Sequence, residues 1–316
     1  MLFDLLKYPA KIALRLYCKK LIVSNPTLLN IKGPVLIAAN HPNSFLDAII
    51  LSTIFKQPIY SLARGDVFKK KWLSIILHSL NMLPIYRLSE GVSNINNNYT
   101  TFNNCINIFK QGGIILIFSE GICINEWHLK PLKKGTARLA FMAWQQNIPL
   151  TILPVGINYS NFYGFIKTVH IHIGNCITPS NFNFNNTVGN INHLISTSIY
   201  QSLSPLVYEF SFTDKQTIEK KFSAPAFTKN IVAKTIGLIG YYLHLPLNTL
   251  IKKIVQNFLK DKDHFDSMVV GIAFITYPIF ILLICLGGCY FFGITYALFF
   301  LFFIPVSAWF YVHCKN

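Results

Sequence analysis

The feature of the sequence that most constrains its fold is a long stretch without charge near the carboxyl end. No Asp, Glu, Lys or Arg occurs from Ser267 to Cys314, and a helix of that length would run roughly 70 Å at about 1.5 Å per residue. Because a bilayer core is about 30 Å thick, the stretch must fold back on itself. We predict two transmembrane helices near 268–286 and 291–312, joined by a very short loop in LGGCYFFG (286–293). A buried helix pair in a soluble protein is the alternative.

Basic residues flank this hairpin on both sides and predict its orientation. Lys260 and Lys262 precede it and Lys315 follows it, and positively charged flanks favour the cytoplasmic side of a membrane. We therefore expect an integral membrane protein whose two termini lie in the cytoplasm. The predicted membrane region is 229–316, and its first segment, 229–256, is apolar with basic ends and is interrupted by Pro246. This pattern is typical of an interfacial or a re-entrant helix.

The first residues, 1–29, have the pattern of amphipathic helices at a membrane interface. Basic residues recur every four positions at Lys7, Lys11, Arg15 and Lys19, and aliphatic residues occupy another side. A helix with a basic and an apolar face lies in the interface of an anionic bilayer, although the same pattern fits a helix packed on its own domain. Charges interrupt each apolar run, so the segment does not have the apolar core of a signal peptide.

The overall composition also indicates a membrane partner. Hydrophobic residues make up 52% of the 316 residues and charged residues only 13%, with a mean hydropathy of +0.42, which is more apolar than a typical soluble domain. The net charge of +16 requires an acidic partner. No zinc-finger spacing, basic region before heptads or RNA-recognition signature is present, so we expect a phospholipid surface and no nucleic acid. The seven cysteines are scattered, which predicts a reduced, cytosol-facing protein without a metal site.

Between these two ends, short apolar runs alternate with helical patterns. Each run ends at Gly, Pro or Asn, as buried strands do. The alternation predicts an α/β domain with chemistry at the carboxyl ends of its strands. The predicted strands are 33–40, 57–64, 112–121, 148–159 and 168–175.

The stretch IAANHPNSFLDAII (37–50) places a histidine at the carboxyl end of a predicted strand. Pro42 disfavours helix at His41, and a helix starting just after it would carry Asp47 in its first turns. In one continuous helix His41 and Asp47 would lie about 120° apart, so they meet only if His41 stands in the loop. A histidine oriented by a carboxylate is a general base. The alternative is an ordinary loop histidine and a helix-start aspartate.

Further motifs follow in the order of a known family. The four segments are Asn40 and His41 with Asp47, Arg87 in LPIYRLSEG (83–91), Glu120 and Gly121 in FSEG with Lys133 and Lys134 in LKKGTAR (132–138), and Pro154 in ILPVGINY (152–159). In this order they resemble the four sequence blocks of the glycerolipid acyltransferase family, which includes the lysophosphatidate acyltransferases. The resemblance covers roughly residues 30–180.

The resemblance implies a mixed central sheet flanked by helices, in a domain that we place at 30–228, and a catalytic pair. His41 would take the proton of an attacking alcohol. Asp47 would fix the tautomer of His41 and stabilise the imidazolium. No covalent acyl-enzyme is required.

The resemblance also implies a binding site for a phosphorylated substrate. Arg87 offers a fork of donors for a phosphate, and Lys133 or Lys134 adds a point charge. Glu120 and Gly121 would orient a substrate hydroxyl or a neighbouring loop. The alternatives are a surface ion pair for Arg87, a solvated helix start for the lysines and a purely structural role for the carboxylate.

Three positions depart from the family pattern. Five residues separate His41 from Asp47, where four are usual, and this spacing resembles the branch that acylates glycerol 3-phosphate and dihydroxyacetone phosphate. Ser119 stands where proline is usual, and Ile122 and Cys123 stand where Thr-Arg often occurs. The loss of that arginine affects the expected substrate more than the expected reaction.

We therefore predict a membrane-bound acyltransferase that moves a fatty acyl group from acyl-CoA or acyl-carrier protein to lysophosphatidate and needs no cofactor besides this donor. The alternative acceptors are glycerol 3-phosphate and another lipid. A hypothesis of another class is a non-catalytic membrane protein that binds lipid. A serine lipase or esterase would need an activated serine, and no Gly-x-Ser-x-Gly motif occurs.

Overall fold

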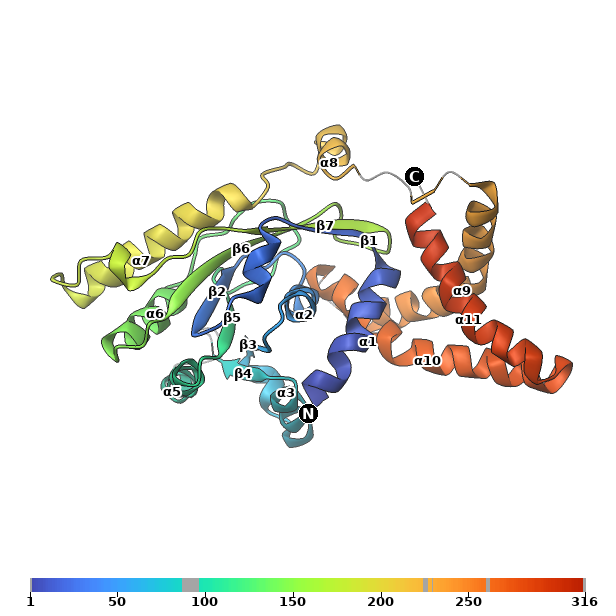
Figure 1. The fold of residues 1–316 in the computed structure, drawn as a ribbon, viewed down its shortest axis with the longest axis horizontal. Helices are drawn as coiled ribbons and strands as arrows, with labels where there is room; N and C mark the ends of the chain where they lie inside the picture. Colours follow the sequence, from blue (N-terminus) through green and yellow to red (C-terminus); the bar gives the residue numbers. More distant parts are fainter. Residues whose placement is uncertain (1, 87–96, 224–226, 229, 260–261, 315–316) are drawn as a thin grey trace.

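The centre of the molecule is a mixed β-sheet (Figure 1). The computed structural model describes residues 2–86, 97–223, 227–228, 230–259 and 262–314. In these residues seven strands pair in the order β1-β7-β6-β2-β5-β3-β4, and only β6 and β7 are antiparallel. The strands are β1 (Cys18–Val23), β2 (Val35–Ala39), β3 (Ile59–Arg64), β4 (Met82–Ile85), β5 (Ile114–Phe118), β6 (Thr151–Tyr159) and β7 (Lys167–Ile173).

All five strands expected from the sequence are present, and two further strands form the edges of the sheet. One of them, β1, lies in the segment predicted to be helical, so Lys19 belongs to a strand and not to the basic face of a helix. It pairs in parallel with β7. The other, β4, pairs in parallel with β3. In the sequence, one residue separates the end of β4 from Arg87. Edge strands are short and partly exposed, so their apolar pattern is weak.

Helices cover both faces of the sheet. Successive residues of a strand point to opposite faces, and in β2 Ile37 packs in one apolar cluster while Leu36 and Ala38 pack in the other. The first cluster includes side chains of α1 (Leu2–Tyr17), α2 (Phe45–Ile54) and the end of α8 (Lys215–Lys221). The second includes side chains of α5 (Asn97–Lys110), α6 (Gly135–Gln145) and α7 (Val188–Leu203). This arrangement confirms the predicted fold class.

The amino-terminal helix α1 packs on the domain and also keeps an apolar exposed side. It runs through Pro9 as one helix, and Phe3, Leu14 and Tyr17 are buried. Other apolar side chains of α1 are exposed: Leu5, Tyr8 and Ile12. The short helix α3 (Lys71–Ser79) likewise exposes Trp72, Ile75 and Ile76.

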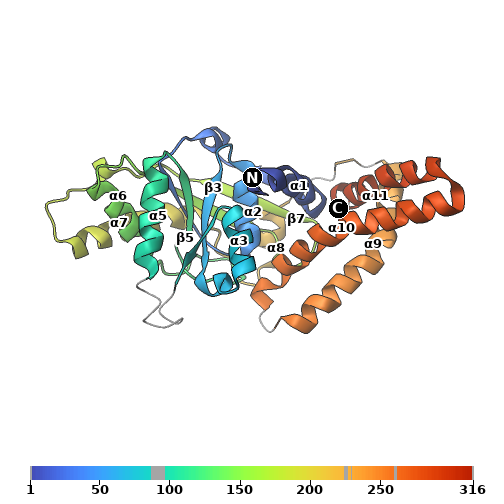
Figure 2. The ribbon, with the colours of Figure 1, turned by 90° about the horizontal axis from the view of Figure 1, so that it is seen from below.

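The carboxyl-terminal region consists of three helices that extend away from the sheet (Figure 2). They are α9 (Ile231–Phe258), which is continuous through Pro246, α10 (Phe265–Phe292) and α11 (Ile294–Cys314). In the described part of the chain, two helices are long and apolar enough to cross a membrane, Lys262–Phe292 and Ile294–Cys314. The first contains the predicted span 268–286, and the second contains 294–312 of the predicted span 291–312, whose first residues belong to the end of α10 and the turn.

The turn between α10 and α11 lies at the last residue of the predicted stretch 286–293. Gly287 and Gly288 are helical, and Gly293 alone connects the two helices, with a φ of 93° that favours glycine. A Cβ atom on Gly288 would lie 2.7 Å from the Phe300 ring. Gly288 therefore allows close packing of the two helices, and Gly293 makes the turn.

Candidate active site

The candidate site lies where β2, β5 and β6 end, at the carboxyl edge of the sheet. His41 follows β2 after Asn40, and the Asn40 side chain extends the pairing of β2 with β6. Its amide nitrogen donates to the Ile157 carbonyl at 3.0 Å, and its carbonyl oxygen accepts the Ile157 N–H at 2.7 Å. The side-chain amide of Asn40 thereby makes the two hydrogen bonds to β6 that the next backbone unit of β2 would otherwise make. Strand β2 therefore ends here, and His41 lies in the loop that follows.

His41 and Asp47 meet as the motif predicted. The Nδ1 atom of His41 lies 2.9 Å from Oδ2 of Asp47, which favours the tautomer with the proton on Nδ1 and a lone pair on Nε2. The imidazole stacks on Phe118, with ring centroids 3.8 Å apart and an interplanar angle of 10°. The His41 side chain is 16% exposed. Its position in the loop, and not in α2, makes the contact feasible.

Asp47 is fully buried and accepts hydrogen bonds from three directions. Besides His41, the backbone N–H of Asn43 donates to Oδ2 at 2.8 Å, and the hydroxyl of Tyr159 donates to Oδ1 at 2.6 Å. These three donors satisfy both oxygens of the buried side chain. The burial of Tyr159 and its contact with Asp47 raise the pKa of the phenol, so it remains a donor.

Glu120 connects the His41 loop to the loop after β5. It is 3% exposed, and its two oxygens accept the backbone N–H groups of His41 at 2.7 Å and of Lys130 at 2.8 Å. Burial raises the pKa of this carboxyl to about 7. The contacts engage both carboxylate oxygens with the backbone, and a direct role in substrate binding stays a prediction.

Gly121 and the two predicted lysines lie at the same end of β5. Gly121 has a φ of 64°, and a Cβ atom there would lie 2.8 Å from Cγ of Lys133, so only glycine fits both the backbone angle and the lysine above it. Lys133 and Lys134 are exposed, directly before α6. Arg87 lies outside the described residues.

Cys123 occupies the position where the family often has arginine. Its Sγ atom accepts the backbone N–H of Ser44 at 2.9 Å, and the residue is buried. Burial raises the pKa of the thiol. The side chain therefore supports the His41 loop and provides no positive charge.

The two histidines of β7 lie apart from this site. His170 and His172 both contact the hydroxyl of Tyr208, at 2.9 Å in each case. Burial lowers the pKa of His170 to about 4. Across residues 2–86 and the later described ranges, no group of three or more His, Cys, Asp or Glu lies close enough to hold a metal ion.

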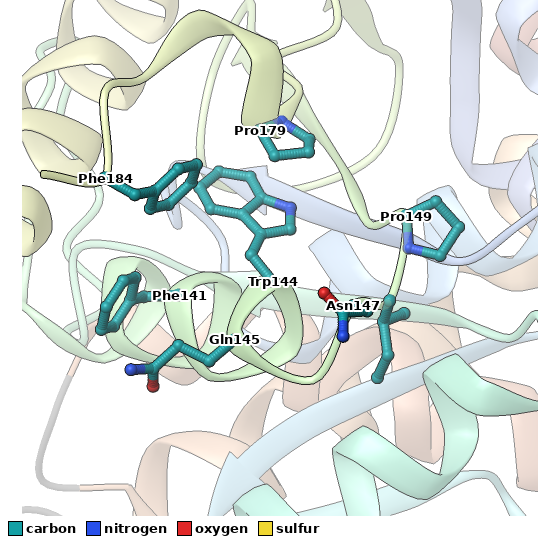
Figure 3. Close-up of a pocket in the computed structure, with 8 residues that line it drawn as sticks. Phe141, Trp144, Gln145, Asn147, Pro149, Pro179 and Phe184 are labelled. Carbon is teal, nitrogen blue, oxygen red and sulfur yellow. The ribbon is translucent and has the colours of Figure 1, made fainter.

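A pocket without charged side chains lies at the other end of the strands, near the amino end of β6 (Figure 3). It is formed by the end of α6 and by residues that precede β6, whereas His41 follows the end of β2, which is parallel to β6. No charged side chain contributes to it, so it does not suit a phosphate. Its lining residues are Phe141, Trp144, Gln145, Asn147, Ile148, Pro149, Pro179 and Phe184.

Sequence reasoning missed several residues that support the site. Tyr159 ends the strand that contains Pro154, and its contact with Asp47 joins positions far apart in the chain. Asp266 and Ser267, in the first turn of α10, contact Asn43. Asp266 could have been found from its position directly before an uncharged stretch. A carboxylate at such a position needs a polar or charged partner, which indicates a contact with another part of the chain.

The fold and site together define an α/β domain in which a loop histidine is held by a buried carboxylate at the carboxyl edge of the sheet. Residues 20–158 match a family model described as Acyltransferase. This segment contains every described residue of the predicted site. Residues 20–158 therefore form a domain of the glycerolipid acyltransferase family, which confirms the resemblance seen in the sequence.

Curated relatives are similar to the chain at low identity. The chain is 29% identical to 1-acyl-sn-glycerol-3-phosphate acyltransferase from Bacillus subtilis, over 36% of this chain and 52% of that protein. It is 26% identical to the protein of the same name from Borreliella burgdorferi, over 54% of this chain and 64% of that protein. The chain thus spans between half and two thirds of these relatives.

A solved structure is also similar. The crystal structure of the 1-acyl-sn-glycerophosphate acyltransferase PlsC from Thermotoga maritima aligns with a TM-score of 0.46 and 16% identity, over 69% of this chain and 80% of that chain.

Proposed function

We propose that the protein is an O-acyltransferase that moves a fatty acyl group from a thioester, acyl-CoA or acyl-carrier protein, to the free hydroxyl of lysophosphatidate, giving phosphatidate. The observation that carries this proposal is the contact of His41 Nδ1 with the buried carboxylate of Asp47 at 2.9 Å. The names of the relatives support the choice of acceptor. The reaction needs no cofactor besides the donor.

The His41–Asp47 pair suits a direct transfer between thioester and alcohol. Nε2 of His41 accepts the proton of the acceptor hydroxyl while its oxygen attacks the thioester carbonyl. The new C–O ester bond forms, the C–S bond breaks, and the proton passes from the imidazolium to the departing thiolate. Asp47 keeps the correct tautomer of His41 and stabilises the imidazolium during the reaction.

The basic residues near the site suit the phosphate of the acceptor. We assign phosphate binding to Lys133 and Lys134, which are exposed at the end of β5, and to Arg87, which follows β4 in the sequence. Glu120 and Gly121 shape the loops around His41, because the carboxylate accepts the His41 N–H. The net charge of +16 favours anionic substrates in general.

We further propose that the protein is integral to a membrane, with α10 and α11 as its two spans and both termini in the cytoplasm. The length and apolar surface of these helices support this assignment. The exposed apolar residues of α1 and α3 support contact of the domain with the bilayer surface, since basic helices with apolar and aromatic side chains bind such interfaces. A lipid acceptor would then reach His41 without leaving the membrane.

Glycerol 3-phosphate is the second candidate acceptor. The observation that favours it is the five-residue separation of His41 and Asp47, which resembles the branch acting on that substrate. A soluble acceptor would need the same base and the same phosphate-binding residues, so the difference must be measured.

The test uses the purified full-length protein in phospholipid micelles. Thiol release is followed from acyl-CoA and then from acyl-carrier protein, with lysophosphatidate and glycerol 3-phosphate offered separately. The variants are His41→Ala, Asp47→Asn and, as a control, His193→Ala, which changes an exposed histidine of α7.

We expect turnover with lysophosphatidate that is lost in His41→Ala and Asp47→Asn and retained in His193→Ala. Turnover that survives in His41→Ala would refute the general-base assignment, and turnover with glycerol 3-phosphate alone would select the second acceptor. A folded protein that binds lipid vesicles without turning over any of these pairs would support a lipid-binding protein instead.

A further inference from the structure

The first turn of α10 packs directly against the loop that carries His41. Ser267 and Asn43 are fully buried. The Ser267 hydroxyl donates to the Asn43 carbonyl at 2.7 Å and accepts the backbone N–H of Leu46 at 3.3 Å. The Asn43 side-chain amide donates to Asp266 Oδ2 at 3.1 Å. Helix α10 thus makes hydrogen bonds on both sides of Ser44, to Asn43 before it and to Leu46 after it.

Asp266 is itself fixed from the side of the sheet. It is 1% exposed, and its carboxylate pairs with the ammonium of Lys167, which is fully buried at the start of β7. The backbone N–H of Gly164 donates to its Oδ1 at 2.8 Å. A buried carboxylate that lacked these partners would be strongly disfavoured. The ion pair therefore sets where the first turn of α10 sits relative to the sheet.

The loop between these contacts has a conformation that needs support. Ser44 has a φ of 52°, which residues other than glycine rarely adopt. Its hydroxyl is hydrogen-bonded to Nδ1 of His264 at 2.8 Å, just before α10. The contacts of Ser267 with Asn43 and Leu46 lie on either side of this residue. The carboxyl-terminal region therefore holds the loop on both sides of its strained position.

A short chain of contacts leads from α10 to the catalytic pair. Asn43, which Ser267 and Asp266 hold, donates its backbone N–H to Asp47 Oδ2 at 2.8 Å. The same oxygen contacts Nδ1 of His41. A shift of Asn43 would therefore move a donor of Asp47 and the carboxylate that orients the histidine.

The supporting residues lie outside the segment that matches the family model. The match ends at residue 158, whereas Lys167, Asp266 and Ser267 follow it in the chain. The domain thus takes part of the support of its catalytic loop from the candidate membrane hairpin.

We propose that Asp266 and Ser267 are positioning residues, which hold Asn43 where its N–H meets Asp47, so that the first turn of α10 and the catalytic loop act as one unit. Because this role concerns the same site, it rests on the proposed function. Neither residue needs to touch the substrate, since both act through Asn43.

The test compares two serine substitutions in the same hairpin. Ser267→Ala removes the hydroxyl that contacts the loop, and Ser307→Ala removes a fully buried hydroxyl of α11 that donates to Ile304 within its own helix. Turnover of acyl-CoA with lysophosphatidate and the thermal midpoint are measured for both full-length variants in micelles.

We expect kcat to be about 10- to 100-fold lower in Ser267→Ala than in Ser307→Ala, because small displacements of a catalytic group have effects of that size. The KM values should differ less than about twofold, as for an interaction needed mainly in the transition state. Equal kcat values would overturn the proposal, as would a loss of kcat that both variants share in proportion to their thermal midpoints.

A second readout does not depend on turnover. The rate at which diethyl pyrocarbonate modifies His41, followed by mass spectrometry, reports how firmly the imidazole is held. It should be higher in Ser267→Ala than in Ser307→Ala, and equal rates would overturn the proposal even if neither acceptor were turned over. An inactive native chain with a faster-modified Ser267→Ala variant would instead reject the proposed function alone.

The role of Asp266 is tested without leaving a buried charge. The double variant Asp266→Leu with Lys167→Met removes both charges together, which folded proteins often tolerate, and also removes the contact with Asn43. We expect kcat to fall as in Ser267→Ala. Full kcat in a folded double variant would show that Asp266 does not position the loop.

Discussion

Replacement of Glu120 by glutamine should remove a pH dependence from the stability of this protein. Glu120 is buried, and burial raises the pKa of its carboxyl from 4.5 to about 7 in the folded state. In the unfolded chain the carboxyl regains its ordinary value. Between pH 4.5 and 7 the folded protein therefore holds a proton that the unfolded chain has lost.

The sign and size of the effect follow from this difference. The stabilisation is fully present below about pH 4.5 and is lost as the pH rises to about 7, because the unfolded state binds fewer protons in that window. The change of about 2.5 pH units corresponds to about 3.5 kcal/mol, at about 1.4 kcal/mol for each unit. For a chain of this length, with an unfolding entropy of about 2.1 cal/mol/K per residue, that amounts to about 5 °C in the thermal midpoint.

The assay is thermal unfolding of the full-length protein in micelles at several pH values between 4.5 and 7, followed by tryptophan fluorescence. The native protein is compared with Glu120→Gln and with Glu219→Gln, which changes an exposed glutamate of α8. The midpoint of the native protein relative to Glu120→Gln should fall as the pH rises, whereas its difference from Glu219→Gln should stay nearly constant. A constant difference from Glu120→Gln as well would mean that the backbone donors outweigh burial and keep Glu120 ionised.

Three further substitutions test individual contacts. Tyr159→Phe removes the hydroxyl that donates to Asp47. We expect kcat to fall about tenfold, since hydrogen bonds to charged groups contribute about 1.5–3 kcal/mol. An unchanged kcat in the micelle assay would contradict this expectation. Gly121→Ala forces a positive φ on alanine beneath Lys133 and should lower the free energy of unfolding by about 1–2 kcal/mol, measured by thermal unfolding. Lys7→Met removes the ammonium that donates to the carbonyls of Phe55 and Lys56, just after α2. A loss of about 1 kcal/mol is expected, and an unchanged midpoint would show that the contact contributes nothing.

Local patterns in the sequence predicted the buried strands and the position of His41 in a loop. The buried strands are short apolar runs with clear ends, and Pro42 alone indicated that His41 lies outside α2. The start of α5 lies in an asparagine-rich piece of the sequence, where helix propensity is weak. Its helix forms because Cys105, Ile106 and Phe109 are buried against the sheet, and such tertiary burial overrides weak helix propensity.

The parts of the site that sequence reasoning missed depend on contacts between distant positions. Tyr159 reaches Asp47 of α2 from the end of β6, and Asp266 reaches Asn43 from the start of α10. No periodicity or spacing encodes such pairs. The edge strand β1 was not predicted for a related reason. Only its pairing with β7 makes Cys18–Val23 extended.

The length of α10 has a consequence for the depth of the His41–Asp47 pair in a bilayer. Its 28 residues measure about 42 Å at about 1.5 Å per residue, roughly 12 Å more than a bilayer core. The buried charges of Asp266 and Lys167 lie at its first turn, so the excess length belongs at that end. With α10 as a span, His41 would stand at the level of the lipid headgroups, where the phosphate and free hydroxyl of a lysophospholipid already lie. The acyl chains of acceptor and product would remain in the hydrocarbon layer, and only the thioester would have to arrive from the water.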